Sequence, residues 1–425
     1  MTDLFSELKW RGQVFDATEG APGQLLRNKV TAYIGFDPSA SGLHIGSLVP
    51  IMTMKRLQRF GHSAIALLGG GTGMIGDPSG KTAERTLLSR EDVLANVDGM
   101  RGQLSKFFDK DAGGGPAIRF ANNADWLGTM SAMEFLRDVG KYFTVNYLLS
   151  KESVKRRIEG EEGISFTEFS YSLLQAYDFL VLHDRFDCTL QLGGSDQWGN
   201  IVAGCDLIRK LRSKQAHGLV MPLLLTSSGT KFGKTEGGAV WLDAARTSPF
   251  RFYQFWLNTD DKDVIAHLKY FTFRTQTEIA SLEDSLKNHP ERRDAQRQLA
   301  RDVTEFVHGT DQVSVAERAA AVLFGDSLAN ASVEDILMVF DDVPSVTVNA
   351  SALESGIGAA ELAVTSGLAA SKGEAARLIK QGGLYLNDRR LTDERGQVKM
   401  ADAIGGSVIV LRKGQRERRI VKIRP

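Results

Sequence analysis

Four short stretches of the chain combine glycine with hydrogen-bonding or charged residues in ways that could serve chemistry. In the first, apolar residues near Tyr33 lead through a glycine-containing turn to His44 and Gly46, where a helix is expected to begin. An imidazole can donate to phosphate oxygens, glycine leaves room for a flat ring, and a helix start exposes unpaired N–H groups. Because an isolated His-x-Gly is more often an ordinary helix start, a phosphate site here depends on the other stretches.

A second group of polar residues lies along one predicted helix, at about 165–182. At spacings of three, four and three residues, one stripe of this helix carries Glu168, Tyr171, Gln175 and Asp178. Such a stripe is usually the wet face of a helix. A tyrosine, an amide and acids without lysine or arginine suit recognition of a polar ligand better than solubility, so the composition favours a binding face.

The third stretch, 191–200, is a strand end followed by two glycines, Asp196 and Gln197. At the carboxyl edge of a parallel sheet, Asp196 is suited to accept hydrogen bonds from ribose hydroxyls. An ordinary strand-to-helix turn, capped by Ser195 or Asp196, explains the same residues. Both roles are compatible.

The fourth stretch, 229–238, places Lys231 and Lys234 three residues apart among glycines, with Thr235 beside them. Two ammonium groups on a mobile loop could close on a triphosphate and neutralise the charge of departing pyrophosphate. A lysine pair in a surface loop is usually only solvated, but the glycines and the hydroxyl favour a phosphate clamp.

A competing motif, Gly71 to Gly76, matches the dinucleotide fingerprint G-x-G-x-x-G after a predicted strand. That fingerprint must open a long helix with an apolar face. The chain instead continues Asp77-Pro-Ser-Gly-Lys-Thr, which is rich in turn residues. A nicotinamide-dependent enzyme is therefore disfavoured.

Strand-like and helical patterns alternate through the first half of the chain and predict a mostly parallel sheet with crossover helices. The strand candidates are residues 31–36, 63–68, 117–121 and 189–192. A helix-rich insertion near 128–163 carries apolar and aromatic residues, which indicates either a cover for the sheet or a subunit interface.

The second half of the chain changes character twice. Helices are expected from Pro249 to about Gly325, one opened by a capping box of Thr275 and Glu278 and a second by Pro290. An acidic stretch follows. From Glu361 to Pro425 there are fourteen basic and seven acidic residues, a net charge of +7, which predicts a polyanion-binding tail. Its expected elements are a helix at 371–380, a strand at 384–387 and a hairpin at 407–423.

Composition narrows the class of protein. A length of 425 residues exceeds what one core usually supports, and a formal net charge of zero gives no attraction of the whole chain to nucleic acid or membrane. Two cysteines cannot build a disulfide framework. Because neither a targeting segment nor an apolar run of membrane-spanning length is evident, we expect a cytoplasmic location and no membrane partner.

Taken in order, these stretches resemble bacterial-type tyrosyl-tRNA synthetases, a family of class I aminoacyl-tRNA synthetases. The resemblance covers nearly the whole chain and rests on Tyr33-Ile-Gly-Phe-Asp-Pro, His44-Ile-Gly-Ser, Gly69 to Lys81, Gly163-Ile-Ser-Phe-Thr-Glu-Phe-Ser-Tyr, Gln175-Ala-Tyr-Asp, Gly193-Gly-Ser-Asp-Gln-Trp-Gly-Asn and Lys231-Phe-Gly-Lys-Thr. It implies activation of L-tyrosine by ATP, transfer to tRNA(Tyr), Mg²⁺ arriving with ATP, no tightly bound cofactor, no metal held by the protein alone, and a homodimer.

The resemblance also implies an α/β fold class with a particular domain order. The expected parts are a Rossmann-like, mostly parallel sheet catalytic domain at 1–248 with its helical insertion near 128–163, a helical tRNA-binding domain at 249–325, an acidic linker at 326–352 and a small α+β RNA-binding domain at 353–425.

Site residues follow by matching the family's motifs. Those implied for tyrosine are Tyr33 and Asp178 at the phenol hydroxyl, Asp77, Tyr171 and Gln175 at the ammonium, and Asn123 completing the pocket. Those implied for ATP are Ser39 and His44 at the phosphates, Gly46, Gly193, Asp196 and Gln197 around the adenosine, and in addition Asp37, Ser47 and Lys234. Those implied to close over pyrophosphate are Lys81, Arg85, Lys231, Lys234 and Thr235.

Three features depart from the family pattern. Ser47 stands where a second histidine usually reaches the ribose, Pro50 lies in or just after the first turn of the helix, and Phe232-Gly233 separates the two lysines of the clamp. None removes an essential charge, so we expect activity with altered ATP affinity. The alternative is an RNA-binding protein descended from a synthetase that has lost aminoacylation.

Overall fold

A computed structural model of the chain describes residues 3–79, 87–108, 115–160, 163–225, 232–235, 238–324, 328, 332–341, 343–414 and 417–424. They form two compact units. The first comprises Met1–Ser248 and Trp256–Val303, and the second Pro249–Phe255 and Thr304–Pro425. The segment 249–325, expected to be one helical domain, is thus divided between the two units.

A six-stranded sheet is the centre of the first unit, with the order β1-β6-β5-β2-β3-β4. Its strands are β1 (Asp16–Ala17), β2 (Thr31–Phe36), β3 (Ser63–Leu68), β4 (Arg119–Asn122), β5 (Cys188–Gly194) and β6 (His217–Met221). All neighbours pair in parallel except β1, which is antiparallel to β6. The predicted mostly parallel sheet is confirmed.

The strand order reverses between β2 and β5. From β2 the chain moves to β3 and β4 on one side, whereas β5 and β6 continue on the other. Crossover connections then diverge, and a crevice opens at the carboxyl ends of the two central strands. Tyr33 on β2 lies opposite Gln191 on β5 in this part of the sheet.

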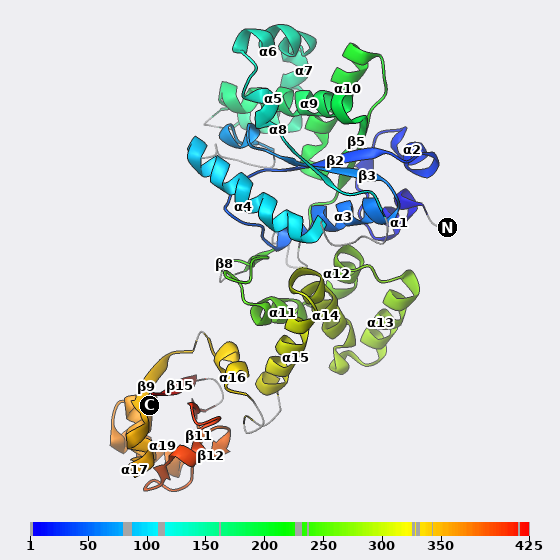
Figure 1. The fold of residues 1–425 in the computed structure, drawn as a ribbon. Coiled ribbons are helices and arrows are strands. Elements are labelled where there is room, and N and C mark those ends of the chain that lie inside the picture. The colour runs from blue at the N-terminus through cyan, green and yellow to red at the C-terminus, as the bar shows by residue number, and fades with distance from the viewer. Residues whose placement is uncertain are drawn as a thin grey trace. The chain divides into compact units, whose positions relative to one another are not determined.

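Helices cover both faces of this sheet (Figure 1). One face is covered by α3 (Leu48–Arg59) and α4 (Arg90–Phe108), the other by α9 (Phe166–Phe186) and α10 (Trp198–Arg212). Ser165 caps α9 by accepting a hydrogen bond from the N–H of Glu168. Pro50 is the third residue of α3, where the helix lacks a partner for its N–H, so it starts no kink.

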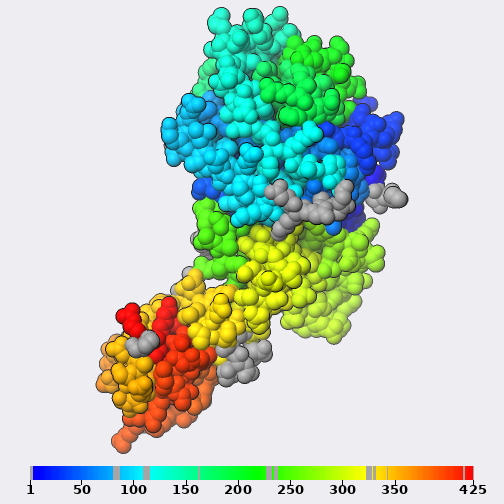
Figure 2. Space-filling model, in the orientation of Figure 1, coloured from blue at the N-terminus to red at the C-terminus, as the bar shows by residue number. Residues whose placement is uncertain are grey.

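Three of the remaining helices of the first half lie in the predicted insertion, namely α6 (Ala132–Asp138), α7 (Val145–Leu149) and α8 (Glu152–Ile158). The other three precede it in the chain: α1 (Leu4–Trp10), α2 (Ala21–Arg27) and α5 (Ala124–Leu127). In the space-filling view, the cyan to blue-green residues of the insertion form part of the outer surface of the first unit (Figure 2).

The helices of the middle region are α11 (Pro249–Leu257), α12 (Val264–Phe271), α13 (Gln276–Asn288), α14 (Asp294–His308) and α15 (Thr310–Phe324). The predicted capping box of Thr275 and Glu278 opens α13. Pro290 does not open a long helix directly. It starts a short 3₁₀ turn, which ends where Arg293 adopts a φ of 53°, and α14 begins after it.

The second unit contains a five-stranded sheet with the order β12-β11-β14-β15-β9. Its elements are α16 (Val333–Val339), β9 (Ser345–Asn349), α17 (Ala350–Ser355), α18 (Ala359–Thr365), α19 (Lys372–Lys380), β11 (Leu384–Leu386), β12 (Arg389–Arg390), β14 (Val408–Lys413) and β15 (Glu417–Arg424), with a two-stranded pair of β10 (Ile357–Gly358) and β13 (Gln397–Val398). The helix, the strand and the hairpin expected in the tail are all present.

The expected linker at 326–352 needs correction. Its residues 345–349 form β9, which pairs in parallel with β15 and places the buried Val348 in the core of this sheet. Ile336 on α16 and Phe340 directly after it pack in one cluster with Val410 and Ile420. Acidic composition obscured a segment whose apolar residues are part of the C-terminal fold. In the described part of the chain, no helix is long and apolar enough to cross a membrane.

Candidate active site

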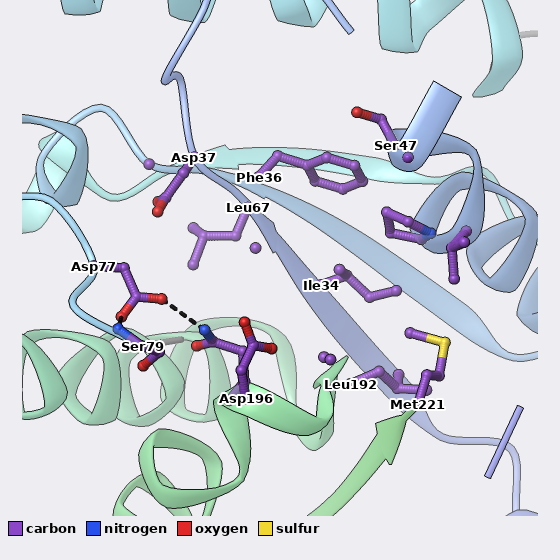
Figure 3. Close-up of a pocket in the computed structure, with 18 of the residues that line it drawn as sticks. Ile34, Phe36, Asp37, Ser47, Leu67, Asp77, Ser79, Leu192, Asp196 and Met221 are labelled. Carbon is purple, nitrogen blue, oxygen red and sulfur yellow. Dashed lines mark hydrogen bonds between the residues drawn. The ribbon is translucent and has the colours of Figure 1, made fainter. Parts of the chain in front are cut away.

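A cavity of about 450 Å³ lies at the carboxyl ends of β2 and β5, where the strand order reverses (Figure 3). Its volume is in the range of small-ligand sites. Most of the residues expected to bind tyrosine or ATP line it, namely Tyr33, Asp37, His44, Gly46, Ser47, Asp77, Asn123, Tyr171, Gln175, Asp178, Gly193, Asp196 and Gln197.

One end of the cavity holds a buried carboxylate. Asp178 on α9 is only 2% exposed, and its two oxygens accept hydrogen bonds from Asn123 Nδ2 at 3.0 Å and Trp126 Nε1 at 2.7 Å. Burial raises the pKa of Asp178 to about 7, although the two hydrogen bonds act in the opposite direction. The carboxyl group is therefore oriented by two side chains and costly to keep charged.

The hydroxyl of Tyr33 lies in the same part of the cavity. Tyr33 is 1% exposed, its ring packs against Phe179 at 5.2 Å, and its hydroxyl has no hydrogen-bond partner among the described residues. Burial and the nearby Asp178 raise the pKa of this phenol, which keeps it protonated and able to donate. Since an unpaired buried hydroxyl costs free energy, the position suits a polar group of a ligand.

A network of amides joins the walls of the cavity. Asp77 accepts from Gln197 Nε2 at 2.6 Å and from the N–H of Ser79 at 2.9 Å (Figure 3). Asn200 Nδ2 lies 3.1 Å from Gln175 Oε1 and 3.2 Å from Ser79 Oγ. The network thereby connects α9, α10 and the stretch around Asp77.

Tyr171 lies beside this network. Its hydroxyl is 3.4 Å from each carboxylate oxygen of Asp37. Burial, together with Asp37 and Asp77, holds the pKa of Tyr171 well above its usual range. The phenol hydroxyl of Tyr171 therefore lies close to the carboxylate of Asp37 and near enough to Asp77 for both charges to act on it.

The other end of the cavity is the turn before α3. His44 Nδ1 accepts a hydrogen bond from the N–H of Gly46 at 3.0 Å. In the neutral ring the proton then resides on Nε2, so that this nitrogen can donate to a ligand. A side chain at position 46 has no room, because its Cβ would lie 2.7 Å from His44 Cε1. The flat ring lying against Gly46 in this structure is the imidazole itself.

Backbone hydrogen bonds fix the position of this turn. The N–H of Ile45 donates to the carbonyl of Val240 at 2.8 Å, and the N–H of Leu242 donates to the carbonyl of Leu43 at 2.9 Å. Both residues beside His44 are buried, whereas His44 is exposed. The site thus presents an imidazole on a clamped backbone.

Several predicted residues are not placed at the cavity. Ser39 is exposed on the adjoining turn and does not line it. Lys81, Arg85 and Lys231 lie outside the described residues. The clamp residues Lys234 and Thr235 form β7 (Lys234–Thr235), which pairs with β8 (Gly238–Ala239), and their side chains are not described.

The polar stripe of α9 divides into two parts. Tyr171, Gln175 and Asp178 line the cavity, as a binding face should. Glu168 instead forms a buried ion pair with Arg157 at 2.8 Å, which ties α9 to α8. The spacing predicted all four residues on one face of the helix. In the structure Glu168 pairs with Arg157, so it is not available to a ligand in the cavity.

Sequence reasoning missed Trp126, Ser79 and Asn200. Their only signal was proximity: Trp126 follows Asn123 by three residues, Ser79 follows Asp77 by two, and Asn200 ends the motif that begins at Gly193. None could be assigned a partner without the fold.

The fingerprint at Gly71 to Gly76 has a different role. It opens only a three-residue 3₁₀ helix, and the N–H of Gly71 donates to Asn123 Oδ1 at 2.7 Å. A Cβ at Gly73 would lie 2.7 Å from Pro38 Cγ, and Gly76 adopts a φ of 85°. Each glycine of the motif thus has a local structural role that involves no dinucleotide.

Comparisons with known proteins agree with this geometry. Residues 26–325 match the family model of tRNA synthetases class I (W and Y), and residues 335–421 match that of the tyrosine–tRNA ligase SYY-like C-terminal domain. The chain belongs to the class I tyrosyl-tRNA synthetases. The predicted family and fold class are thus confirmed, and the chain is a tyrosine–tRNA ligase that uses ATP.

Individual relatives support this membership over the full length. The chain is 53% identical to the tyrosine–tRNA ligase of Roseiflexus castenholzii, with 100% of both chains covered, and 48% identical to that of Geobacillus stearothermophilus, with 99% of both covered. Among solved structures, a C-terminally truncated mitochondrial tyrosyl-tRNA synthetase of Aspergillus nidulans has a TM-score of 0.69 and 30% identity, covering 76% of this chain and 95% of that one.

Proposed function

We propose that the cavity binds tyrosine at its Asp178 end and ATP at its His44 end, and forms tyrosyl-adenylate between them. The observation that carries the proposal is the juxtaposition, in one cavity, of a buried acceptor beside the unpaired Tyr33 hydroxyl with an exposed imidazole at a helix start. The first suits a phenol, and the second suits phosphate oxygens.

The roles of the residues that bind tyrosine follow from the difference between the two ends of the cavity. Asp178 accepts the phenol hydroxyl and Tyr33 donates to it, while Asn123 holds Asp178 in place. Such a site rejects phenylalanine because its buried polar groups would be left unpaired, a discrimination for which this family is the standard example. Asp77, Tyr171 and Gln175 receive the ammonium.

The nucleotide roles are assigned to the opposite end. His44 Nε2 and Ser39 contact the phosphates, with Asp37 nearby. The nucleoside contacts are proposed for Gly46, Ser47, Gly193, Asp196 and Gln197, and the pyrophosphate contacts for Lys81, Arg85, Lys231, Lys234 and Thr235.

The first step joins the tyrosine carboxylate oxygen to the α-phosphorus of ATP and breaks the bond to the β,γ-phosphates, which leave as pyrophosphate. No general base is needed, because the carboxylate is already ionised at neutral pH. In the second step a ribose hydroxyl of the tRNA takes the tyrosyl group and AMP leaves. This chain therefore contributes orientation and stabilisation of charge on phosphate.

Mg²⁺ accompanies ATP in this proposal and neutralises phosphate charge when bound. Among the described residues no group of three or more His, Cys, Asp or Glu gathers as a metal site. A cation that keeps its waters and binds phosphate oxygens needs only one or two carboxylates, and Asp37, which this proposal places near the phosphates, lines the cavity. This residue fits such an ion.

A homodimer is proposed from the surface of the insertion. Six exposed apolar side chains belong to the insertion or follow it closely in the chain, namely Met133, Leu136, Val145, Leu149, Ile158 and Phe166. Exposed apolar surface marks interaction sites in soluble proteins where it is contiguous, and a second copy of the chain would cover these side chains. A tyrosine–tRNA ligase serves protein synthesis, so we infer a cytoplasmic location.

Tyrosine-dependent exchange of pyrophosphate into ATP tests the proposed reaction. The enzyme should catalyse exchange with tyrosine and not with phenylalanine. Absence of exchange with any amino acid, alongside retained tRNA binding, would instead support the alternative, an RNA-binding protein derived from a synthetase.

The C-terminal unit is proposed to hold the tRNA together with the helices at 249–325. A chain ending after α15 (Thr310–Phe324) keeps the whole first unit and removes the basic tail. It should form tyrosyl-adenylate normally and lose most tRNA charging. The cut must precede α16, because a later one would expose the apolar residues that α16 and β9 share with β15.

A further inference from the structure

One face of α4 contacts the turn that leads to His44. Asn96, Gly99 and Gln103 are separated by three and four residues, which aligns them on one stripe of the helix. We call this stripe the amide face of α4, the helix labelled in Figure 1. None of its three residues lines the cavity.

The amide face meets the turn at three points. Asn96 Nδ2 donates to the carbonyl of Pro38 at 3.0 Å, and the N–H of Leu43 donates to Gln103 Oε1 at 2.8 Å. Between them, Gly99 lies so close that a Cβ built there would be 3.1 Å from the carbonyl oxygen of Ser41. The helix therefore holds the turn by two side-chain amides and one close backbone approach.

Gln103 acts on the residue directly before His44. Leu43 is buried, so its N–H cannot turn to water and depends on Gln103 as acceptor. The carbonyl of Leu43 is held from the other side by Leu242. The N–H of Ile45 donates to the carbonyl of Val240. Of these three hydrogen bonds beside His44, two join backbone to backbone, and the third has the side chain of Gln103 as its acceptor.

Space at the turn is equally restricted. A Cβ at Gly42 would lie 3.1 Å from Gln103 Nε2 and 3.1 Å from Arg246 Nη1. If the amide of Gln103 were replaced by an apolar group, Leu43 would have to move to satisfy its N–H. The imidazole of His44 would move with it, since its ring is bonded to the backbone of Gly46.

We propose that Gln103 is a positioning residue for adenylate formation, which sets the place of His44 Nε2 through the backbone of Leu43. The inference rests on the proposed contact of His44 with the ATP phosphates. Misplacing such a group by about 1 Å is enough to cost roughly a hundredfold in rate. Gln103 itself touches neither substrate.

The test is a double-mutant cycle of Gln103→Met with His44→Ala, read by single-turnover tyrosyl-adenylate formation. Methionine keeps the length of the side chain and replaces the amide oxygen by a thioether sulfur, which is only a weak acceptor. Gln103→Met should lower the maximal rate roughly tenfold to a hundredfold and leave the KM for tyrosine unchanged. In the His44→Ala background the same substitution should have little further effect, because the group it positions is gone.

Three companion variants keep the result interpretable. Gln103→Glu retains an acceptor of the same length and should keep most of the rate. Lys106→Met is the matched control, an exposed residue of the same helix that should change nothing. Gly99→Ala favours the helix yet presses on Ser41, so it should lower the rate without lowering the thermal midpoint, even if Gln103→Met folds poorly.

Different outcomes would contradict the proposed role of His44 and the proposed role of Gln103. If His44→Ala forms adenylate at the native rate, the proposed role of His44 fails. If His44→Ala is impaired but Gln103→Met is not, or if Gln103→Met costs the same factor in both backgrounds, His44 keeps its role and the positioning role of Gln103 fails.

Discussion

The two ends of the cavity are built in different ways. At the Asp178 end, the functional groups are buried and held by other side chains, with Asn123 and Trp126 bonded to the carboxylate. At the His44 end, the imidazole is exposed, and the hydrogen bonds that hold it involve the backbone of Leu43, Ile45 and Gly46.

This difference suits the roles proposed for the two ends. A buried site discriminates because every polar group left unpaired costs free energy. A phosphate site must admit a charged, solvated ligand, so its groups remain exposed and rely on a rigid backbone for precision. Substitutions should therefore change substrate recognition at the first end and reaction rate at the second.

The largest expected effect is at the buried end. Asp178→Asn removes the charge and leaves the donors of Asn123 and Trp126 competing for a single oxygen. Breaking such a buried, hydrogen-bonded charge should cost about 4 kcal/mol, or roughly a thousandfold in kcat/KM for tyrosine. The KM for ATP should change little, as measured by pyrophosphate exchange.

A matched control exists on the same helix. Asp184 is paired with Arg212 at the surface, and Asp184→Asn should leave tyrosine use intact. Equal losses for tyrosine and ATP in Asp178→Asn would contradict the division of the cavity into two ends.

The next largest effect is at the exposed end. Gly46→Ala places a Cβ 2.7 Å from His44 Cε1 and should displace the imidazole. We expect the maximal rate of adenylate formation to fall about a hundredfold while the KM for tyrosine is unchanged. Gly102→Ala serves as the control, because Gly102 has open space around it. A raised KM for tyrosine in Gly46→Ala would contradict the division of the cavity into two ends.

The pH dependence should separate the ends without mutation. With a pKa of about 7 for Asp178, protonation below that pH removes its charge and leaves it a much weaker acceptor for a phenol. The kcat/KM for tyrosine in the native enzyme should therefore fall about tenfold per pH unit below 7. A profile that stays flat from roughly pH 5.5 to about pH 8 would contradict this assignment.

Stability of the ligand-free enzyme should change in the opposite direction. The folded pKa of Asp178 is raised from 3.8 to about 7, so the folded state binds the proton more tightly than the unfolded chain. The contribution of this group to stability is then lost as the pH rises from 3.8 to about 7. The difference in thermal midpoint between native enzyme and Asp178→Asn should follow that pH range.

The smallest effect concerns Tyr33. Because its hydroxyl is buried without a partner among the described residues, Tyr33→Phe should leave the thermal midpoint unchanged or raise it slightly. It should nonetheless lower kcat/KM for tyrosine roughly fivefold, the value of about 1 kcal/mol for one hydrogen bond. Lowered stability with unchanged tyrosine use would show that the hydroxyl serves the fold instead.

The sequence was most informative where local patterns and chemistry coincide. The strands at 31–36 and 63–68 were predicted to the residue, because uninterrupted apolar runs between turn signals define buried parallel strands. The motifs around His44, Asp178 and Asp196 identified the family and most of the cavity lining.

Where one principle competed with another, prediction failed. An acidic composition was taken as a linker, although Val346 and Val348 alternate as a strand should and pair beside β15. Glu168 was predicted to belong to the same binding face as Asp178, but it forms an ion pair with Arg157. In both cases a partner distant in sequence decided the outcome.

By itself, the sequence determined the family and the mostly parallel sheet, and it supplied the residues proposed to recognise a phenol, an ammonium and a phosphate, because those depend on residue type and short spacing. Only the tertiary structure decided how they are held. The bonds from Trp126 to Asp178 and from Gln103 to Leu43 join segments 52 and 60 residues apart. Such contacts arise from packing α5 on α9 and α4 on a loop, and no local pattern encodes them.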